Sequence, residues 1–153
     1  MEKTLVLVKP DAVQRGLVGE IISRFEKKSI KIVGCKMMKL KEAVLREHYA
    51  HVVDESFFEE LSQFMSSSPV FVLCLEGIDA VNIVRKLSGT DNFQLGTIRG
   101  DFSVSSQKNL IHSSDSITTA KREISRFFSS AELFDYDKTE WKHIYAEVDK
   151  HKS

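Results

Sequence analysis

Short segments with the periodicity of strands and helices follow one another along this chain, and their order is what most limits its fold. Four segments have the pattern of β-strands: residues 3–8, 30–39, 70–76 and 109–112. Five have apolar residues at helical spacing: residues 16–29, 41–50, 56–65, 79–88 and 115–128. Without the middle pair of helices, the order is strand, helix, strand, strand, helix, strand. This order predicts an α+β, ferredoxin-like (βαββαβ) fold, in which helices cover a four-stranded antiparallel sheet and the middle helical pair is an insertion.

The length and charge of the chain narrow the class of protein further. We expect a single domain over residues 1–153, ending in a polar tail at about residues 147–153, because 153 residues are about one domain's worth. Lysine plus arginine and aspartate plus glutamate each number 22, so the charge balance predicts no nucleic-acid site. The longest apolar run, residues 70–75, is too short to cross a membrane, so we predict no membrane partner.

The two cysteines and the N-terminus bear on the cellular compartment. Cys35 and Cys74 lie in apolar strand-like segments, where a buried reduced thiol is the usual form. No motif groups them with histidines as metal ligands. The N-terminus runs directly into a strand-like segment without a signal-peptide pattern. We therefore expect a protein of the reducing cytoplasm.

Residues 89–106 carry glycines and polar residues without clear periodicity, which predicts a long loop. Such a loop is uncommon inside a compact domain unless it binds something. Arg99 lies between Gly96 and Gly100, where the backbone can approach an anion and the guanidinium can bind two phosphate oxygens. The alternative is an ordinary turn with a surface pair between Arg99 and Asp101.

His112 ends an apolar strand-like segment, just before a helix that begins with small and acidic capping residues. A neutral imidazole is a competent nucleophile toward phosphorus, and a helix N-terminus nearby favours negative charge. The residues of this segment alone support equally well a strand-end histidine that is hydrogen-bonded to a neighbour.

Lys9 and the Phe57-Phe58 pair could also contribute to an anion site. Lys9 follows a buried strand and could contact a phosphate, although most lysines in such positions are solvated. One of the two rings could be exposed for stacking on a base, although the pattern favours both in the core. Zinc, phosphate-loop, protein-kinase and dinucleotide fingerprints are absent from the sequence. From the residues alone, separated cations and a strand-end histidine indicate a phosphate site.

Several short motifs occur together in a fixed order. They are Lys9-Pro10-Asp11, Arg15-Gly16-Leu17-Val18-Gly19, His48-Tyr49, Gly96-Thr97-Ile98-Arg99-Gly100-Asp101 and Asn109-Leu110-Ile111-His112-Ser113-Ser114-Asp115-Ser116. In this order they resemble the motifs of nucleoside diphosphate kinases, from about Thr4 to Phe128 and more loosely to Tyr145. The resemblance implies transfer of the γ-phosphoryl group of a nucleoside triphosphate, typically ATP, to a nucleoside diphosphate by a ping-pong mechanism.

The resemblance also implies a role for each matching position. His112 is the expected nucleophile, phosphorylated on its pros nitrogen, with Glu123 orienting the imidazole and Ser114 supporting the carboxylate. The expected nucleotide-binding residues are Lys9, Tyr49, Phe57, Arg85, Thr90, Arg99 and Asn109, with Phe57 stacking on the base. Mg²⁺ is the implied cofactor, bound through the nucleotide's phosphates without direct protein ligands, and Asp115 lies near its water shell. The implied substrates are di- and triphosphates of the various bases, ribo and deoxy.

The sequence departs from the family pattern at three places. The loop at residues 90–95 is shorter than usual and lacks prolines. In the family this loop helps to form subunit contacts and a wall of the nucleotide site. Its shortening therefore affects the expected role of Thr90 as a phosphate ligand, the base preference and the stability of the oligomer. Ser113 replaces a small Gly or Ala, and Ser106 stands where the family often has an apolar residue against the base.

Assembly and two alternative functions complete the expectations. The family forms hexamers or tetramers, and we favour a hexamer. One alternative is a catalytically silent member that serves as an assembly or regulatory subunit, which would be expected to lack His112, Lys9 or Arg99. Another is a phosphohistidine donor to other proteins, which the sequence leaves open as a secondary role.

Overall fold

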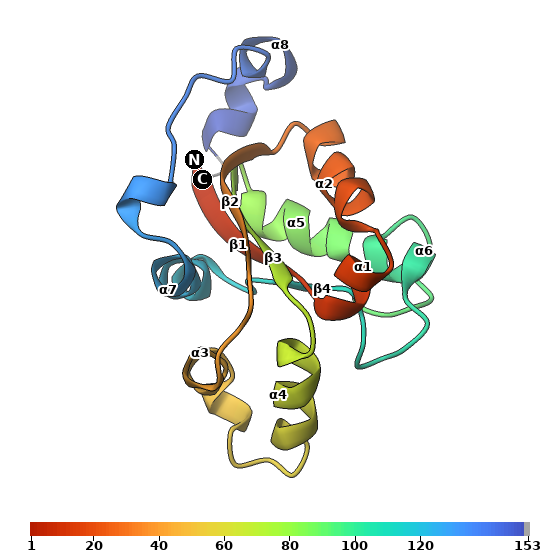
Figure 1. The fold of residues 1–153 in the computed structure, drawn as a ribbon. Coiled ribbons are helices and arrows are strands. Elements are labelled where there is room, and N and C mark those ends of the chain that lie inside the picture. Colours follow the sequence, from red (N-terminus) through yellow and green to blue (C-terminus); the bar gives the residue numbers. More distant parts are fainter. Residues whose placement is uncertain (152–153) are drawn as a thin grey trace.

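The computed structural model describes residues 1–151, which are built around a four-stranded antiparallel sheet (Figure 1). The strands are β1 (Glu2–Val8), β2 (Lys31–Met38), β3 (Val70–Gly77) and β4 (Ile111–Ser113), in the spatial order β2-β3-β1-β4. β1 pairs antiparallel with β3 on one side and with β4 on the other. This topology confirms the predicted ferredoxin-like fold.

Helices cover both faces of the sheet, and β1 is therefore buried on both sides. The helices are α1 (Pro10–Gln14), α2 (Val18–Lys27), α3 (Glu42–His48), α4 (Phe58–Ser66), α5 (Ala80–Ser88), α6 (Ile98–Phe102), α7 (Ile117–Phe127) and α8 (Trp141–Ile144). Short 3₁₀ helices span Ala50–Val52, Ser130–Glu132 and Glu147–His151. Leu5 and Leu7 of β1 pack in a core with α3, α4 and α7, while Val6 and Val8 pack in another with α2, α5 and α6. This alternation follows from the period of two along a strand.

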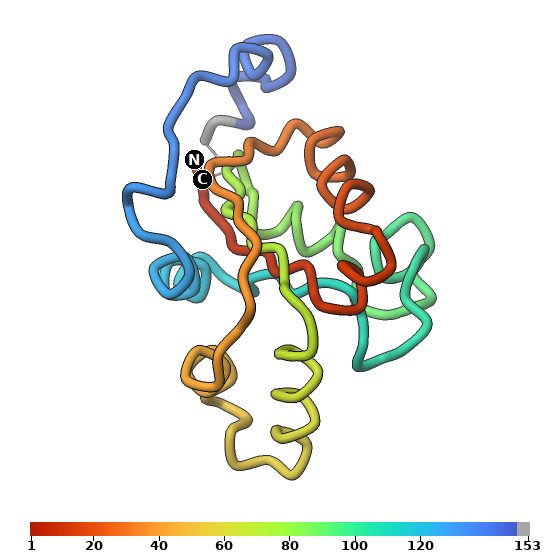
Figure 2. The backbone as a smooth tube through the Cα atoms, viewed as in Figure 1, coloured from red at the N-terminus to blue at the C-terminus, as the bar shows by residue number. Residues whose placement is uncertain are grey.

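Three short helices, α1, α6 and α8, lie where none was expected. Pro10 is the first residue of α1, where a missing backbone N–H costs nothing. The predicted loop at residues 89–106 contains α6, whose first turn is capped by Thr97 accepting a hydrogen bond from the Gly100 N–H at 3.0 Å. The loop is therefore partly ordered as a helix, and the green-to-teal tube in Figure 2 traces it from α5 to β4.

Two other expectations need correction. The last strand covers residues 111–113, so Asn109 and Leu110 precede it, and Leu110 has a positive φ of 73°. Cys74 is buried as expected, but Cys35 is exposed. Cys35 lies on the edge strand β2, after a β-bulge between Ile32 and Gly34 that interrupts the regular alternation of side chains.

The segment after α7 runs along the outer edge of β2. The Phe134 N–H donates to the Val33 carbonyl at 2.7 Å, and the Tyr136 hydroxyl donates to the Ile32 carbonyl at 2.8 Å. Trp141 anchors α8 through a 2.9 Å hydrogen bond from its indole N–H to the Ser29 carbonyl. Of the predicted polar tail, residues 147–151 form the last 3₁₀ helix, and residues 152–153 lie outside the described residues. Within residues 1–151, helices of the length and apolar character needed to cross a bilayer are absent.

Candidate functional site

The pairing of β1 with β4 fixes the position of His112. β4 is a three-residue strand, and His112 lies opposite Leu7 of the buried central strand. Its neighbours Ile111 and Ser113 are buried, whereas the His112 side chain is about one quarter exposed. The strand therefore presents the imidazole at the surface while its two flanking residues hold the backbone in the sheet.

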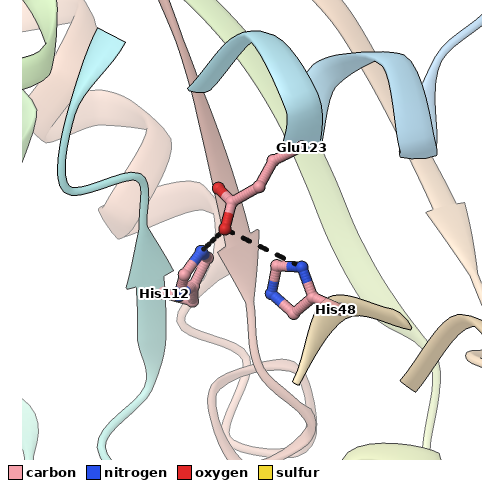
Figure 3. A group of neighbouring side chains, drawn as sticks. All are labelled: His48, His112 and Glu123. Carbon is pink, nitrogen blue, oxygen red and sulfur yellow. Dashed lines mark hydrogen bonds and ion pairs between the residues drawn. The ribbon is translucent and has the colours of Figure 1, made fainter. Parts of the chain in front are cut away.

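A buried carboxylate holds one nitrogen of this imidazole (Figure 3). Glu123, from α7, accepts a hydrogen bond from His112 Nε2 at 2.9 Å on one oxygen and from the Ser114 hydroxyl at 2.5 Å on the other. Ser114 is fully buried, and its own backbone N–H donates to the Leu5 carbonyl at 3.1 Å. The three residues predicted to form the catalytic group thus lie in one hydrogen-bonded chain.

The protonation of Glu123 decides which nitrogen of His112 is free. Burial by itself raises the pKa of this carboxyl, but the hydrogen bonds from His112 and Ser114 outweigh burial and lower it. A carboxylate can only accept hydrogen bonds, so Nε2 of His112 carries the proton in the neutral ring. The lone pair is then on Nδ1, which is the pros nitrogen.

His112 opens into a cavity of about 540 Å³ whose wall carries three arginines and three carboxylates. Five of the predicted site residues line it: Tyr49, Arg85, His112, Asp115 and Glu123. Arg122 and Arg126 of α7 line it as well. Burial raises the pKa of the Tyr49 hydroxyl, with a smaller contribution from the Glu123 carboxylate. The Tyr49 hydroxyl is therefore neutral at physiological pH. Glu47 pairs with Arg126, and Glu123 is bound to His112 and Ser114, so two arginines remain against the Asp115 carboxylate and the cavity is suited to an anion.

Arg99 is bound mainly to the backbone of the loops around the site. Its guanidinium donates to the carbonyls of Asn109 at 3.3 Å, Gly89 at 2.7 Å and Ile111 at 2.5 Å. The alternative of a surface pair with Asp101 is wrong, because Asp101 pairs with Arg24 at 2.6 Å. Arg99 therefore ties the loop after α5 to the strand that carries His112.

Lys9 joins the same network from the end of β1. It is 8% exposed, so it is not a solvated surface lysine, and its Nζ donates to the Asn109 side-chain oxygen at 2.7 Å. Burial, followed by the nearby Arg99 charge, lowers the pKa of Lys9 to about 8, while Asp11 partly opposes them. The ammonium is thus largely charged at neutral pH and is held next to Asn109.

Thr90 lies on a second hollow, which adjoins the first. This hollow has a volume of about 350 Å³ and shares Arg85 and Ser113 with the His112 cavity, and Arg99 also lines it. The Thr90 hydroxyl lies 3.3 Å from both Asp91 and Gln94 side-chain oxygens. The short loop thus still brings Thr90 beside two arginines.

The two adjacent phenylalanines have different environments. Phe58 is 5% exposed and belongs to the interior, whereas Phe57 is 45% exposed, so the expectation of two core rings is wrong. Phe57 lines a hollow of about 250 Å³ together with Phe64 of α4 and with Lys108, which precedes Asn109. A flat ring is therefore available on the side of the site where the Lys9–Asn109 pair lies.

Sequence reasoning gave no role to two residues that shape the site. The Asp11 carboxylate accepts a hydrogen bond from the Leu110 N–H at 3.0 Å, which supports the left-handed backbone there. His48 is 8% exposed, and its ring lies 4.7 Å from that of His112. Both residues belong to the quoted motifs, but only the fold shows what they contact.

Comparison with known proteins gives a consistent result. Residues 2–133 match the family model described as nucleoside diphosphate kinase. A nucleoside diphosphate kinase of Parabacteroides distasonis is 50% identical over 149 residues, which cover 95% of this chain and 97% of that protein. The structure of a halophilic nucleoside diphosphate kinase from Halobacterium salinarum in complex with CDP matches with a TM-score of 0.91 and 45% identity, covering 95% of this chain and 99% of that chain. A nucleoside diphosphate kinase family protein from Babesia bovis matches with a TM-score of 0.90 and 40% identity, covering 95% and 100%.

Proposed function

This chain belongs to the nucleoside diphosphate kinase family and has its phosphotransferase activity, and we propose that it works through a phosphohistidine at His112. The observation that carries the proposal is the hydrogen-bonded chain from Ser114 through Glu123 to His112 Nε2, which leaves Nδ1 as the nucleophilic nitrogen beside a cationic cavity. The substrates are nucleoside di- and triphosphates, with ATP as the typical donor.

The reaction has two half-reactions at one nitrogen. Nδ1 of His112 attacks the γ-phosphorus of the triphosphate and forms an N–P bond. The bond between the γ-phosphorus and the β,γ-bridging oxygen breaks, and the diphosphate leaves with that oxygen. A terminal β-phosphate oxygen of a second diphosphate then attacks the phosphorus, and the N–P bond breaks to restore neutral His112. Glu123 keeps the Nε2 proton in place throughout and stabilises the positive charge that develops on the ring.

The phosphates are bound by the cations around the cavity. Arg85 is exposed at the boundary of the two hollows. Within residues 1–151 its guanidinium makes one long hydrogen bond, of 3.5 Å, to the Ser113 carbonyl, so most of its donors remain available. Lys9 contributes an ammonium, while Tyr49, Thr90 and Asn109 offer neutral hydrogen-bonding groups. Arg99 adds positive charge without donating to the phosphates directly, because its guanidinium already donates to three backbone carbonyls.

Nucleotide kinases generally need a divalent cation, and we propose Mg²⁺ here. The site fits such an ion because Asp115 places an exposed carboxylate on the wall of the His112 cavity. A hydrogen bond from Thr119 lowers the pKa of this carboxyl, which is therefore ionised at neutral pH. Bound through the nucleotide's phosphates and water, Mg²⁺ would neutralise phosphate charge, and Asp115 would contact its water shell.

The base is held on the exposed face of Phe57, over the hollow lined by Phe64 and Lys108. Stacking uses the π-face that every base has, so it discriminates poorly among bases. We therefore propose broad specificity, in which purine and pyrimidine nucleotides are accepted alike.

Assembly and location are part of the same proposal. We place the enzyme in the cytoplasm as a hexamer in which residues 1–153 act as a single domain. The neutral balance of 22 basic and 22 acidic residues is compatible with close packing of several copies. Sedimentation velocity on the full chain tests the hexamer, and a tetramer would refute it.

Intact mass spectrometry after brief incubation with ATP and Mg²⁺ tests the mechanism. We expect one acid-labile phosphate on the native chain and on a His143→Ala control, none on His112→Ala, and discharge to GDP with formation of GTP. His143 is an exposed residue of α8, outside both hollows. If the native chain binds nucleotide but gains no phosphate, it is a silent subunit. If the phosphate moves to proteins and not to GDP, the chain is a phosphohistidine donor.

A further inference from the structure

His48 is a buried histidine directly beside the nucleophile, at the end of α3. Its ring lies edge-on to the His112 ring, with centroids 4.7 Å apart, and edge-on to Phe127 at 5.3 Å. Only 2% of its side chain is exposed, although it lines the cavity of about 540 Å³. It is thus part of the inner wall of the site and has no role in the function proposed above.

One nitrogen of His48 is already occupied. The Arg126 guanidinium lies 3.1 Å from Nδ1, and a guanidinium can only donate, so Nδ1 must accept. The nearest Glu123 oxygen is 3.8 Å from Nδ1, beyond hydrogen-bond distance. Arg126 is itself held by Glu47, whose carboxylate lies 2.9 Å from its Nε. This fixes the orientation of the His48 ring.

The other nitrogen is a donor without a partner. Burial, followed by the neighbouring His112, lowers the pKa of His48 to about 3, so the ring is neutral and its single proton lies on Nε2. Nε2 is fully buried and has no hydrogen-bond partner among residues 1–151. Figure 3 shows this nitrogen on the side of the ring that faces His112. A buried donor that lacks an acceptor is costly, so it points to a group that arrives during function.

The surroundings determine the chemistry of that group. Three arginines (Arg85, Arg122, Arg126) and three carboxylates (Glu47, Asp115, Glu123) line the same cavity. Glu47 pairs with Arg126, and Glu123 already accepts from His112 and Ser114. Two arginines then remain against one carboxylate, so an anionic acceptor is favoured there. We propose that His48 is a further catalytic residue, whose Nε2–H donates to an oxygen of the phosphoryl group while that group is bound to His112. This inference rests on the proposed phosphohistidine at His112. A neutral donor can stabilise the phosphoryl oxygens without altering the proton balance of the transfer.

The alternative of a metal ion shared by His48, His112 and Glu123 is less well supported. Their ligand atoms lie within 4.8 Å of one another, which is compatible with a small cation. The nitrogen of His48 nearest Glu123 is Nδ1, however, and it already accepts from a positive guanidinium. A cation at that position would be repelled by Arg126, whereas an anion at Nε2 would be attracted.

Substitutions at His48 separate the two ring nitrogens. Asparagine places its amide near the Nδ1 position and has no atom at Nε2, whereas glutamine extends its amide nitrogen to about the Nε2 position. We expect His48→Asn to slow single-turnover phosphorylation of His112 by ATP and Mg²⁺ by about 10- to 100-fold, the usual effect of losing a hydrogen bond to a charged group. His48→Gln should recover most of the rate. His143→Asn serves as the control for a change of histidine outside the site.

Histidine-labelled ¹⁵N NMR of the native full chain gives a second readout that does not depend on variants folding. Phosphorylation of His112 should move the His48 Nε2–H proton downfield, as expected for a new hydrogen bond to a phosphoryl oxygen. An unmoved Nε2–H resonance, or equal rates for native and His48→Asn chains, would overturn the role of His48. If the native chain takes up no phosphate at all, the proposed function itself fails, so the two failures are distinguishable.

Discussion

Raising the pH from 7 to 10 should weaken nucleotide binding and stabilise the nucleotide-free protein, and both effects should arise from Lys9. Lys9 is 8% exposed, and its ammonium is hydrogen-bonded to Asn109. Burial together with the Arg99 charge lowers its pKa to about 8. The charged form is the one that binds phosphate, while the neutral form is the one that burial favours.

The size of both effects follows from the pKa. At pH 9, about one tenth of the nucleotide-free protein carries a charged Lys9, so affinity for a nucleoside diphosphate should fall about tenfold for each pH unit above 8. In the unfolded chain the lysine keeps its ordinary pKa of 10.5, so between pH 8 and 10.5 the unfolded state binds more protons. Stability therefore rises with pH in this window, by about 3 kcal/mol in total at 1.36 kcal/mol per pKa unit.

The assay compares the native chain with Lys9→Met, which removes the titrating group but keeps an unbranched apolar stem. Calorimetric titration with ADP and Mg²⁺ from pH 6.5 to 10 gives the affinity, and urea unfolding at the same pH values gives the stability. Other groups titrate in this range in both proteins, so only the difference between the two proteins reports on Lys9. We expect the native affinity to approach that of Lys9→Met as pH rises.

Parallel pH profiles for the two proteins would refute this reasoning. So would a native affinity that stays constant up to pH 10, because the ammonium would then have an ordinary lysine pKa in spite of its burial. A fall in native stability relative to Lys9→Met between pH 8 and 10.5 would reverse the predicted sign and show that burial does not dominate.

Three further outcomes follow from the structure. Glu123→Gln replaces one acceptor oxygen by an NH₂ group, so either the His112 N–H or the Ser114 hydroxyl loses its acceptor. Single-turnover phosphorylation should then fall about 10- to 100-fold, and an unchanged rate would contradict the orienting role of Glu123. Phe57→Ala should raise the KM for ADP, GDP and CDP by similar factors of about 5 to 100, and a rise for one base only would exclude general stacking. Gly89→Ala places a methyl group against the Thr97 side chain at a φ of 84°. The free energy of unfolding, measured by urea denaturation, should fall by about 1–3 kcal/mol. An unchanged unfolding midpoint would show that the loop relaxes freely.

The sheet could be predicted from the sequence because its central strands are covered on both sides. β1 and β3 are then nearly continuous apolar runs, which stand out from the surrounding helices. α1 and α6 could not be predicted in this way, since five residues are too few to show a helical period. The exposure of Cys35 depends on a β-bulge beside Gly34, and a glycine alone does not show which of the following side chains the bulge turns outward.

The sequence indicated candidate residues for the site but not their contacts. The family resemblance implied a group of His112, Glu123 and Ser114, and the structure shows the hydrogen bonds that join them. The hydrogen bond between His48 and Arg126 could not be foreseen, because the two residues are 78 positions apart in the sequence. The same holds for the place of His48 in the cavity wall. Residue types indicate which groups can act, whereas the tertiary pairing decides which of them meet.

The pairing of β1 with β4 has a consequence for how activity appears during folding. It joins Val6 to Ser113, and the Lys9–Asn109 hydrogen bond spans 100 positions. Closing so long a loop is entropically costly, and a topology dominated by such distant contacts folds slowly. A nascent or partly folded chain therefore has the proposed nucleophile, His112, and the proposed phosphate-binding lysine, Lys9, on separate segments. The proposed phosphoryl transfer should begin only after these two segments have paired, so phosphorylation of His112 would report on completed folding of the sheet.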